Sequence, residues 1–240
     1  MTQPAWPNMF QPVHYDLEGL GLNRIVVFGF GLVYWTGVWI QARRVRRRIG
    51  RSPNVRPRGS KEKLLWGGWF LVVAAWLALP ALLEIPPDST AYGWAKRAGL
   101  GLGAFLMVAG YAGTLWCYAA MGNAWRMGIS EKEETRLVTS GPYRFVRHPI
   151  YLCQVVMVAA IAVLLPSVLS LAVMAFHLCC VRLKAAEEES YLRTFLGRPY
   201  DAYCAQTGVW FPKFSGAKSA AASTADAQQN PLNTTGQHSR

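Results

Sequence analysis

The sequence contains few charged residues and few cysteines. Only 16% of its 240 residues are Asp, Glu, Lys or Arg, and only 13 residues are acidic. The five cysteines form no CxxC pair and show no Cys/His spacing typical of metal ligands, so we expect neither a disulfide framework nor a metal site. The first 20 residues lack the basic start of a secretory signal peptide and contain Asp16 and Glu18. We therefore expect the first apolar segment to be an uncleaved membrane anchor.

Apolar residues, in contrast, make up 52% of the chain and fall in long runs. Runs of this length with few charges are typical of helices that cross a lipid bilayer. We predict an all-α polytopic integral membrane protein with about five transmembrane helices, at residues 25–40, 64–83, 98–121, 150–165 and 168–181. Only Pro166 and Ser167 separate the last two segments, which predicts a C-terminal helical hairpin.

The formal net charge of +12 is concentrated in one region. Ten of the 25 Lys and Arg residues lie between Arg43 and Lys63. Basic loops remain on the cytosolic side, so this cluster predicts a cytosolic loop at 43–63 rather than a nucleic-acid partner. With five spans, the C-terminus and the connection between the third and fourth spans are then cytosolic as well. We expect a bacterial inner-membrane protein.

The composition divides the chain into four regions. Residues 1–18 are rich in proline and aromatic residues and are expected at the membrane interface. Residues 19–121 hold three transmembrane helices, and residues 122–212 hold most of the polar residues suited to chemistry. Residues 213–240 are mostly Ser, Ala, Thr, Gln and Asn, which predicts a disordered cytosolic tail.

Ionisable residues gather where the last two predicted helices meet the membrane boundary. Pro149 suits the first turn of a helix, so His148 is expected at its cap, beside backbone amides that lack helical partners. Tyr151 follows within that turn. Lys184 and Glu188 are four residues apart on a charged helical extension and therefore face the same side. Because ionisable residues are costly beside apolar helices, this arrangement indicates a polar pocket.

Each of these residues also has a structural interpretation. A basic residue before a helix can anchor it at phosphate headgroups, with His148 as a simple cap. A charged extension can be a solvated, salt-bridged surface, and we expect this for Glu187 and Glu189. His177, in the middle of the last span, is expected to be an interior residue with satisfied hydrogen bonds rather than a catalytic one.

Several short motifs follow one another at the inner ends of the last spans. They are Leu137-Val138-Thr139-Ser140-Gly141, Tyr143, Arg147-His148-Pro149-x-Tyr151, Glu187-Glu188-x-x-Tyr191-Leu192 and Phe195-x-Gly197-x-x-Tyr200-x-x-Tyr203. Over about residues 122–212 the chain resembles the isoprenylcysteine carboxyl methyltransferases and their relatives among the phospholipid methyltransferases.

The resemblance implies a cytosol-facing pocket that binds S-adenosyl-L-methionine between the last helices and the loop before them. The methyl acceptor would be lipophilic and would enter from the bilayer. The implied cofactor-binding residues are Leu137, Val138, Tyr143, His148, Pro149, Ile150, Tyr151 and Glu188. We assign Arg147 and Lys184 to the catalytic group, with Lys184 binding the acceptor.

Two residues depart from the family pattern. Lys184 stands where the carboxyl methyltransferases have an Arg that engages the substrate, and a Lys lacks the bidentate fork of a guanidinium. Cys153 stands where the family usually has Gly. Neither change affects an implied cofactor position, so methyl transfer is predicted more firmly than the identity of its acceptor.

The predicted activity is carboxyl O-methylation of a lipophilic acceptor. Phospholipid N-methylation and thiol S-methylation on the same fold remain alternatives. Another is a sterol-reductase-like oxidoreductase that uses NADPH, but such enzymes have Asn after the Pro and then Gly-Glu, where this chain has Ile150, Cys153 and Gln154. A non-enzymatic membrane accessory protein would explain the hydropathy but not the polar pocket.

The predicted topology can be tested with reporter fusions. Alkaline phosphatase, which is active only in the periplasm, should be inactive when it is fused after Lys213, because the basic region at 43–63 holds that end in the cytosol. A fluorescent-protein fusion at the same position controls for expression. High phosphatase activity there would contradict the topology and the cytosolic site together.

Overall fold

The chain is an all-helical bundle in the computed structural model, which describes residues 21–50, 59–83, 93–125 and 137–213. The segment predicted at the interface, 1–18, and the tail predicted at 213–240, apart from Lys213, lie outside these ranges. The described helices are α1 (Leu22–Ile49), α2 (Ser60–Leu82), α3 (Gly93–Met121), α4 (Pro149–Leu164), α5 (Val168–Leu196) and α6 (Arg198–Gln206), with short 3-10 turns η2 (Gly122–Ala124) and η3 (Gly141–Arg144).

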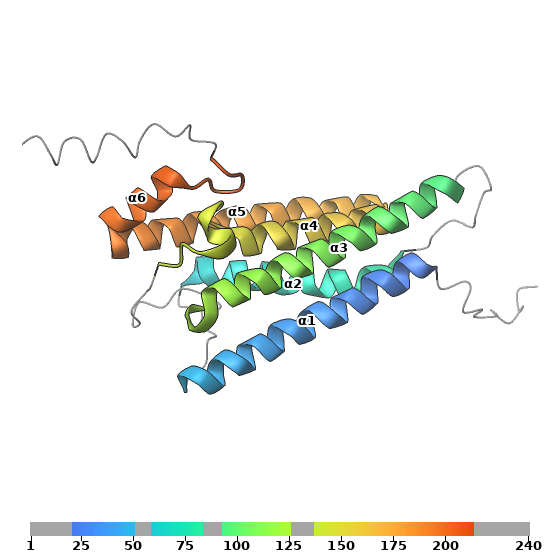
Figure 1. The fold of residues 1–240 in the computed structure, drawn as a ribbon. Helices are drawn as coiled ribbons and strands as arrows, with labels where there is room; N and C mark the ends of the chain where they lie inside the picture. Colours follow the sequence, from blue (N-terminus) through green and yellow to red (C-terminus); the bar gives the residue numbers. More distant parts are fainter. Residues whose placement is uncertain (1–20, 51–58, 84–92, 126–136, 214–240) are drawn as a thin grey trace, which may run out of the picture.

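All five predicted transmembrane segments are helical, which confirms the all-α polytopic membrane fold. Among the described residues, four helices are long and apolar enough to cross a bilayer, and α4 is a shorter apolar helix of 16 residues. The helices α1 to α5 lie side by side in Figure 1. Large apolar side chains such as Leu71, Phe105 and Leu171 are exposed on the bundle surface, as expected where lipid replaces water.

The predicted hairpin of α4 and α5 is confirmed. The Ser167 side chain accepts a hydrogen bond from the Ser170 amide, and the Ser170 hydroxyl accepts one from the Ser167 amide. This reciprocal capping begins α5 only four residues after α4 ends. The charged extension is helical too, because α5 continues without a break to Leu196.

The basic region differs from its prediction as a loop. Helix α1 runs to Ile49, so Arg43 and the other arginines up to Arg48 lie on its last turns. The helix ends at Gly50, which has a φ of 71° that favours glycine. The apolar run ends at residue 40, but the helix continues to Ile49 because arginine is a good helix former.

Glycines allow α3 to approach α4 closely. A Cβ added to Gly103 would lie 2.4 Å from Leu164 Cγ, and one added to Gly110 would lie 2.5 Å from Met157 Cγ and 3.0 Å from the Cys153 carbonyl oxygen. In lipid no hydrophobic effect drives apolar helices together, because the lipid tails are equally apolar. Their association depends instead on close packing, which small residues such as glycine allow. This contact places α4, which carries part of the site, firmly in the bundle.

Buried polar bonds attach α1 to its neighbours. Asn23 Nδ2 donates to the Leu164 carbonyl at 2.9 Å, and Trp76 Nε1 donates to the Val27 carbonyl at 3.1 Å. The Tyr34 ring stacks on Trp76 with centroids 5.6 Å apart. These bonds satisfy polar groups that lipid cannot satisfy, and they bring α1 against both α2 and α4.

Gly110→Leu should destabilise the protein. The new side chain would overlap Met157 and the α4 backbone, so we expect a loss of about 1 to 3 kcal/mol and a lower melting temperature in detergent. Gly101→Leu is the matched control, because Gly101 lies on the same helix with open space around it. Equal melting temperatures for the two variants would contradict the close α3–α4 contact.

Candidate functional site

A pocket of about 270 Å³ lies where the charged end of α5 meets the start of α4. This volume is close to the lower end of the range for small-molecule sites. Nine of the ten residues predicted from the sequence line it: Leu137, Val138, Tyr143, Arg147, His148, Ile150, Tyr151, Lys184 and Glu188. The tenth, Pro149, does not line the pocket but is the first residue of α4, as expected.

Glu188 and the first turn of α4 face each other across the pocket. The Tyr151 hydroxyl donates to Glu188 Oε1 at 2.6 Å, and His148 Nδ1 lies 3.7 Å from Glu188 Oε2. The imidazole stacks on the Tyr151 ring with centroids 5.7 Å apart. One carboxylate oxygen of Glu188 is therefore bound, while the other lies beyond hydrogen-bonding distance of the histidine.

Glu189 does not lie on a solvated surface, and the sequence-based expectation for it was wrong. Its Oε1 accepts hydrogen bonds from Arg147 Nε at 2.8 Å and from His148 Nε2 at 3.2 Å. The hydrogen bond from His148, together with that from Arg147, lowers the pKa of the Glu189 carboxyl to about 2, although partial burial opposes the shift. Successive helical residues point about 100° apart, so Glu188 and Glu189 reach different sides of His148.

Arg147 also holds the segment that follows α6. Its Nη1 donates to the Thr207 carbonyl at 2.5 Å and more weakly to that of Cys204 at 3.4 Å. Its backbone amide donates to the Gly208 carbonyl at 2.8 Å. The arginine predicted as catalytic is thus bound to protein groups on several sides, although it lines the pocket.

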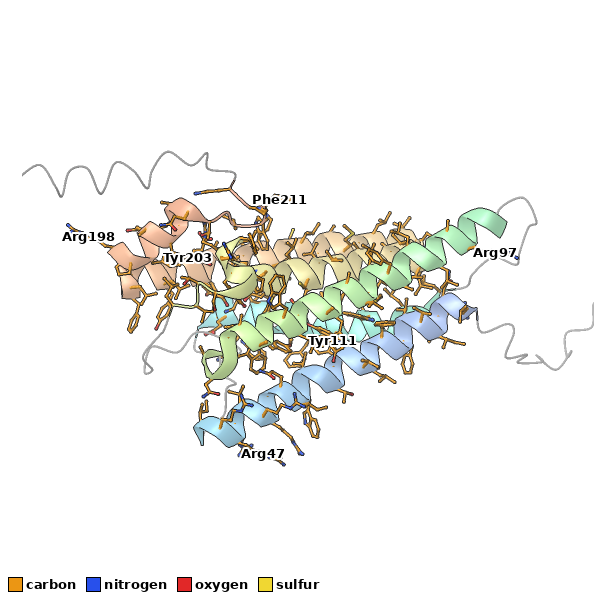
Figure 2. All side chains as sticks on the ribbon, in the orientation of Figure 1. Arg47, Arg97, Tyr111, Arg198, Tyr203 and Phe211 are labelled. Atoms are coloured by element: carbon orange, nitrogen blue, oxygen red, sulfur yellow. The ribbon has the colours of Figure 1, made fainter. Side chains whose placement is uncertain are left out.

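Helix α6 and the residues after it close one side of the site. The Tyr203 hydroxyl donates to the Tyr143 carbonyl at 2.7 Å, and the Trp210 ring lies 5.8 Å from that of His148. Figure 2 shows Tyr203 directed from α6 toward the chain before α4. The sequence contained a signal in its spaced tyrosines, but we did not predict this helix or the role of Trp210.

Lys184 is already paired with carboxylates. Its Nζ lies 3.2 Å from Glu187 Oε2 and 3.9 Å from Glu62 Oε1 at the start of α2. The pair with Glu187 is the salt bridge expected on the extension. Glu62, in contrast, was not predicted, because nothing in the sequence indicates that α2 begins beside α5.

The first three helices supply an aromatic wall that the sequence analysis missed. The lining includes Tyr34 from α1, Trp66 and Trp69 from α2, and Tyr118 from α3. The abundance of tryptophan, ten residues in all, was the available signal. The prediction assigned the pocket to residues 122–212, whereas α1, α2 and α3 contribute much of its apolar surface.

His177 is buried, as predicted, but its hydrogen bonds are not satisfied. Its exposed fraction is 2%, and neither ring nitrogen has a partner among the described residues. Backbone carbonyls within neighbouring transmembrane helices are used by their own helical bonds, so few acceptors are available to it. The residue does not line the pocket.

This geometry defines a polytopic membrane protein with a pocket at one end of its helices that is lined by both ionisable and aromatic side chains. Residues 102–194 match the model of the Isoprenylcysteine carboxyl methyltransferase (ICMT) family, which confirms the resemblance seen in the motifs. The match extends from α3 into the α5 extension and includes every predicted site residue. A domain of this family supports a membrane methyltransferase.

The chain is also similar to two proteins named for metal resistance. It is 28% identical over 149 residues to the nickel-cobalt-cadmium resistance protein NccN of Alcaligenes xylosoxydans xylosoxydans, covering 62% of this chain and 65% of NccN. It is 27% identical over 149 residues to the cobalt-zinc-cadmium resistance protein CzcN of Cupriavidus metallidurans, covering 62% of this chain and 64% of CzcN. The chain therefore spans slightly less than two thirds of each relative.

Arg147→Ala should loosen the C-terminal part of the site. Loss of the side-chain bonds to Glu189 and to the carbonyls of Cys204 and Thr207 should cost about 2 kcal/mol and increase hydrogen exchange over residues 198–213. Arg193→Ala is the control, because Arg193 forms an exposed pair with Asp201 and such pairs add little stability. If both variants exchange alike, Arg147 does not hold this segment.

Proposed function

We propose that the protein transfers a methyl group from S-adenosyl-L-methionine to a lipophilic acceptor. The observation that carries this proposal is the arrangement of Glu188, a pocket-lining residue whose Oε1 accepts a hydrogen bond from Tyr151 while its Oε2 lies 3.7 Å from His148 Nδ1. The match to the methyltransferase family over the same residues supports it.

The residues present suit the polar groups of this cofactor. The cofactor carries an ammonium, a carboxylate and a positively charged sulfonium. The second oxygen of Glu188 is available to the ammonium. The first amides of α4, beside His148 and Pro149, have no side-chain cap and suit the carboxylate, because the helix N-terminus is positive. Leu137 and Val138 supply apolar contacts nearby.

The cofactor, when bound, supplies an activated methyl group for an in-line displacement. Tyr151 and Glu188 orient it, and the aromatic wall around Trp66 and Trp69 receives the apolar acceptor and excludes water. Positioning and desolvation are the main contributions required of the protein in such a reaction. These roles need no strong base in the pocket when the acceptor is already a nucleophile.

The orientation of the bundle supports a cytosolic site. Arg47, on the basic end of α1, lies at the same end of the bundle as Tyr203, whereas Arg97 lies at the opposite end (Figure 2). Basic residues favour the cytosolic side, so the pocket would open there. This argument fits the bacterial inner membrane predicted from the sequence.

The carboxylate acceptor predicted from the sequence depends on Lys184. This acceptor would have to compete with Glu187 and Glu62 for the lysine.

The names of the two relatives suggest metal resistance. In the described part of the chain, however, no group of three or more His, Cys, Asp or Glu side chains is placed to hold a metal ion. We therefore place methyl transfer first.

Glu188→Gln and His148→Ala should each weaken S-adenosyl-L-methionine binding. Loss of a carboxylate that meets an ammonium should cost about 1.5 to 3 kcal/mol, or roughly ten- to a hundredfold in affinity by calorimetry. Glu187→Gln is the control, because Glu187 neighbours Glu188 but does not line the pocket. Lys184→Ala should preserve cofactor affinity and impair use of the acceptor. Unchanged affinity in both Glu188→Gln and His148→Ala, with folded protein, would remove the basis of the proposal.

A further inference from the structure

A second polar pair lies deeper in the pocket than Tyr151 and Glu188. Tyr34 on α1 and Gln154 on α4 both line the cavity, and Gln154 Nε2 donates to the Tyr34 hydroxyl at 3.0 Å. Gln154 follows Tyr151 by three residues, or about 4.5 Å along the helix axis. The pair therefore lies one turn farther into the membrane than the groups assigned to the cofactor.

The amide of Gln154 is incompletely satisfied. Tyr34 is 2% exposed and Gln154 is 8% exposed, and within the described residues Gln154 Oε1 has no hydrogen-bond partner. The surroundings are aromatic: the Trp76 ring stacks on the Tyr34 ring, and the Trp35 ring lies edge-on to it with centroids 4.9 Å apart. A buried amide oxygen without a partner is unfavourable, and lipid provides no donor. A ligand that brings an N–H or O–H to this depth would satisfy it.

The charges around the pocket disfavour an anionic acceptor. Among the lining residues that the structure describes, the two strongly basic side chains, Lys184 and Arg147, are both paired with carboxylates. Glu188 adds a further negative charge to the lining. A carboxylate entering this pocket would meet cations that are already compensated. A neutral group that becomes positively charged during the reaction would be favoured by the surrounding acids.

Among neutral donors, an amine fits the available groups best. A hydroxyl or thiol must lose its proton as it attacks, and neither Gln154 nor Tyr34 is a base. Two possible bases in the described lining lie nearer the cofactor, and both are engaged: Glu188 binds Tyr151 and is assigned to the cofactor ammonium, and His148 contacts Glu189. A neutral amine attacks through its lone pair while its own hydrogens remain in place.

We propose that Tyr34 and Gln154 form the acceptor-recognition element and select a lipophilic amine in its neutral form; this inference rests on the proposed function. The amine N–H donates to Gln154 Oε1 while the nitrogen lone pair attacks the methyl carbon of the cofactor. The C–N bond forms as the C–S bond breaks, and the sulfur keeps the electron pair of that bond. The resulting ammonium then releases a proton to water outside the pocket.

Two probes with the same ring and tail test this inference, para-octylaniline and para-octylbenzoate. Their affinities are measured in nanodiscs for protein saturated with S-adenosylhomocysteine. Gln154→Leu should weaken para-octylaniline binding roughly three- to tenfold, as expected for one lost hydrogen bond, and leave para-octylbenzoate nearly unchanged. Tyr34→Phe should shift the ratio of the two affinities in the same direction. Partitioning of each probe into lipid is common to all variants and cancels in this comparison.

Asn23→Leu is the matched control. Asn23 also bonds α1 to α4, through the Leu164 carbonyl, but it does not line the pocket. This variant should be less stable and keep the probe ratio of the natural protein. An unchanged ratio in Gln154→Leu would overturn the inference, as would a loss of S-adenosylhomocysteine affinity in that variant. Absence of S-adenosylhomocysteine binding in the natural protein would refute the proposed function itself, whereas binding without any para-octylaniline affinity would refute only the amine.

Discussion

The carboxylate of Glu189 joins three parts of the chain that are far apart in sequence. It binds His148 before α4 and Arg147, which in turn holds the carbonyls that follow α6. Removing this carboxylate would leave a partly buried guanidinium and an imidazole without their anionic partner, which is costly. This one group therefore helps to hold His148, on which Tyr151 stacks.

The three neighbouring glutamates, Glu187, Glu188 and Glu189, have different partners. Glu189 binds Arg147 and His148, whereas Glu188 accepts from Tyr151 through one oxygen and is the residue proposed to contact the cofactor. Glu187 forms an ion pair with Lys184 on the same helix. The partners differ because a helix directs each of three consecutive side chains to a different side.

The membrane setting explains why the interior polar groups are informative. Asn23 and Trp76 each donate a hydrogen bond to a backbone carbonyl. These buried donors therefore have partners inside the bundle, as lipid requires. Gln154 is a partial exception, since its nitrogen bonds to Tyr34 while its oxygen has no partner among the described residues. The close α3–α4 contact at Gly110 holds Cys153, and with it the adjacent Gln154, against the bundle. The packing that stabilises the helices therefore also positions the deep end of the pocket.

The sequence by itself determined the five apolar helices, the hairpin at Pro166 and Ser167, and nine of the residues around the pocket, because hydropathy and short motifs are local properties. It could not distinguish Glu189 from Glu187, since the three adjacent residues are all glutamate and differ only in the direction of their side chains on the helix. It also placed Arg43 in a loop, because the apolar run of α1 ends several residues before the helix itself does. The tertiary structure alone decided that Tyr34 meets Gln154 and that Glu62 meets Lys184, since contacts between residues more than a hundred positions apart depend on how whole helices pack.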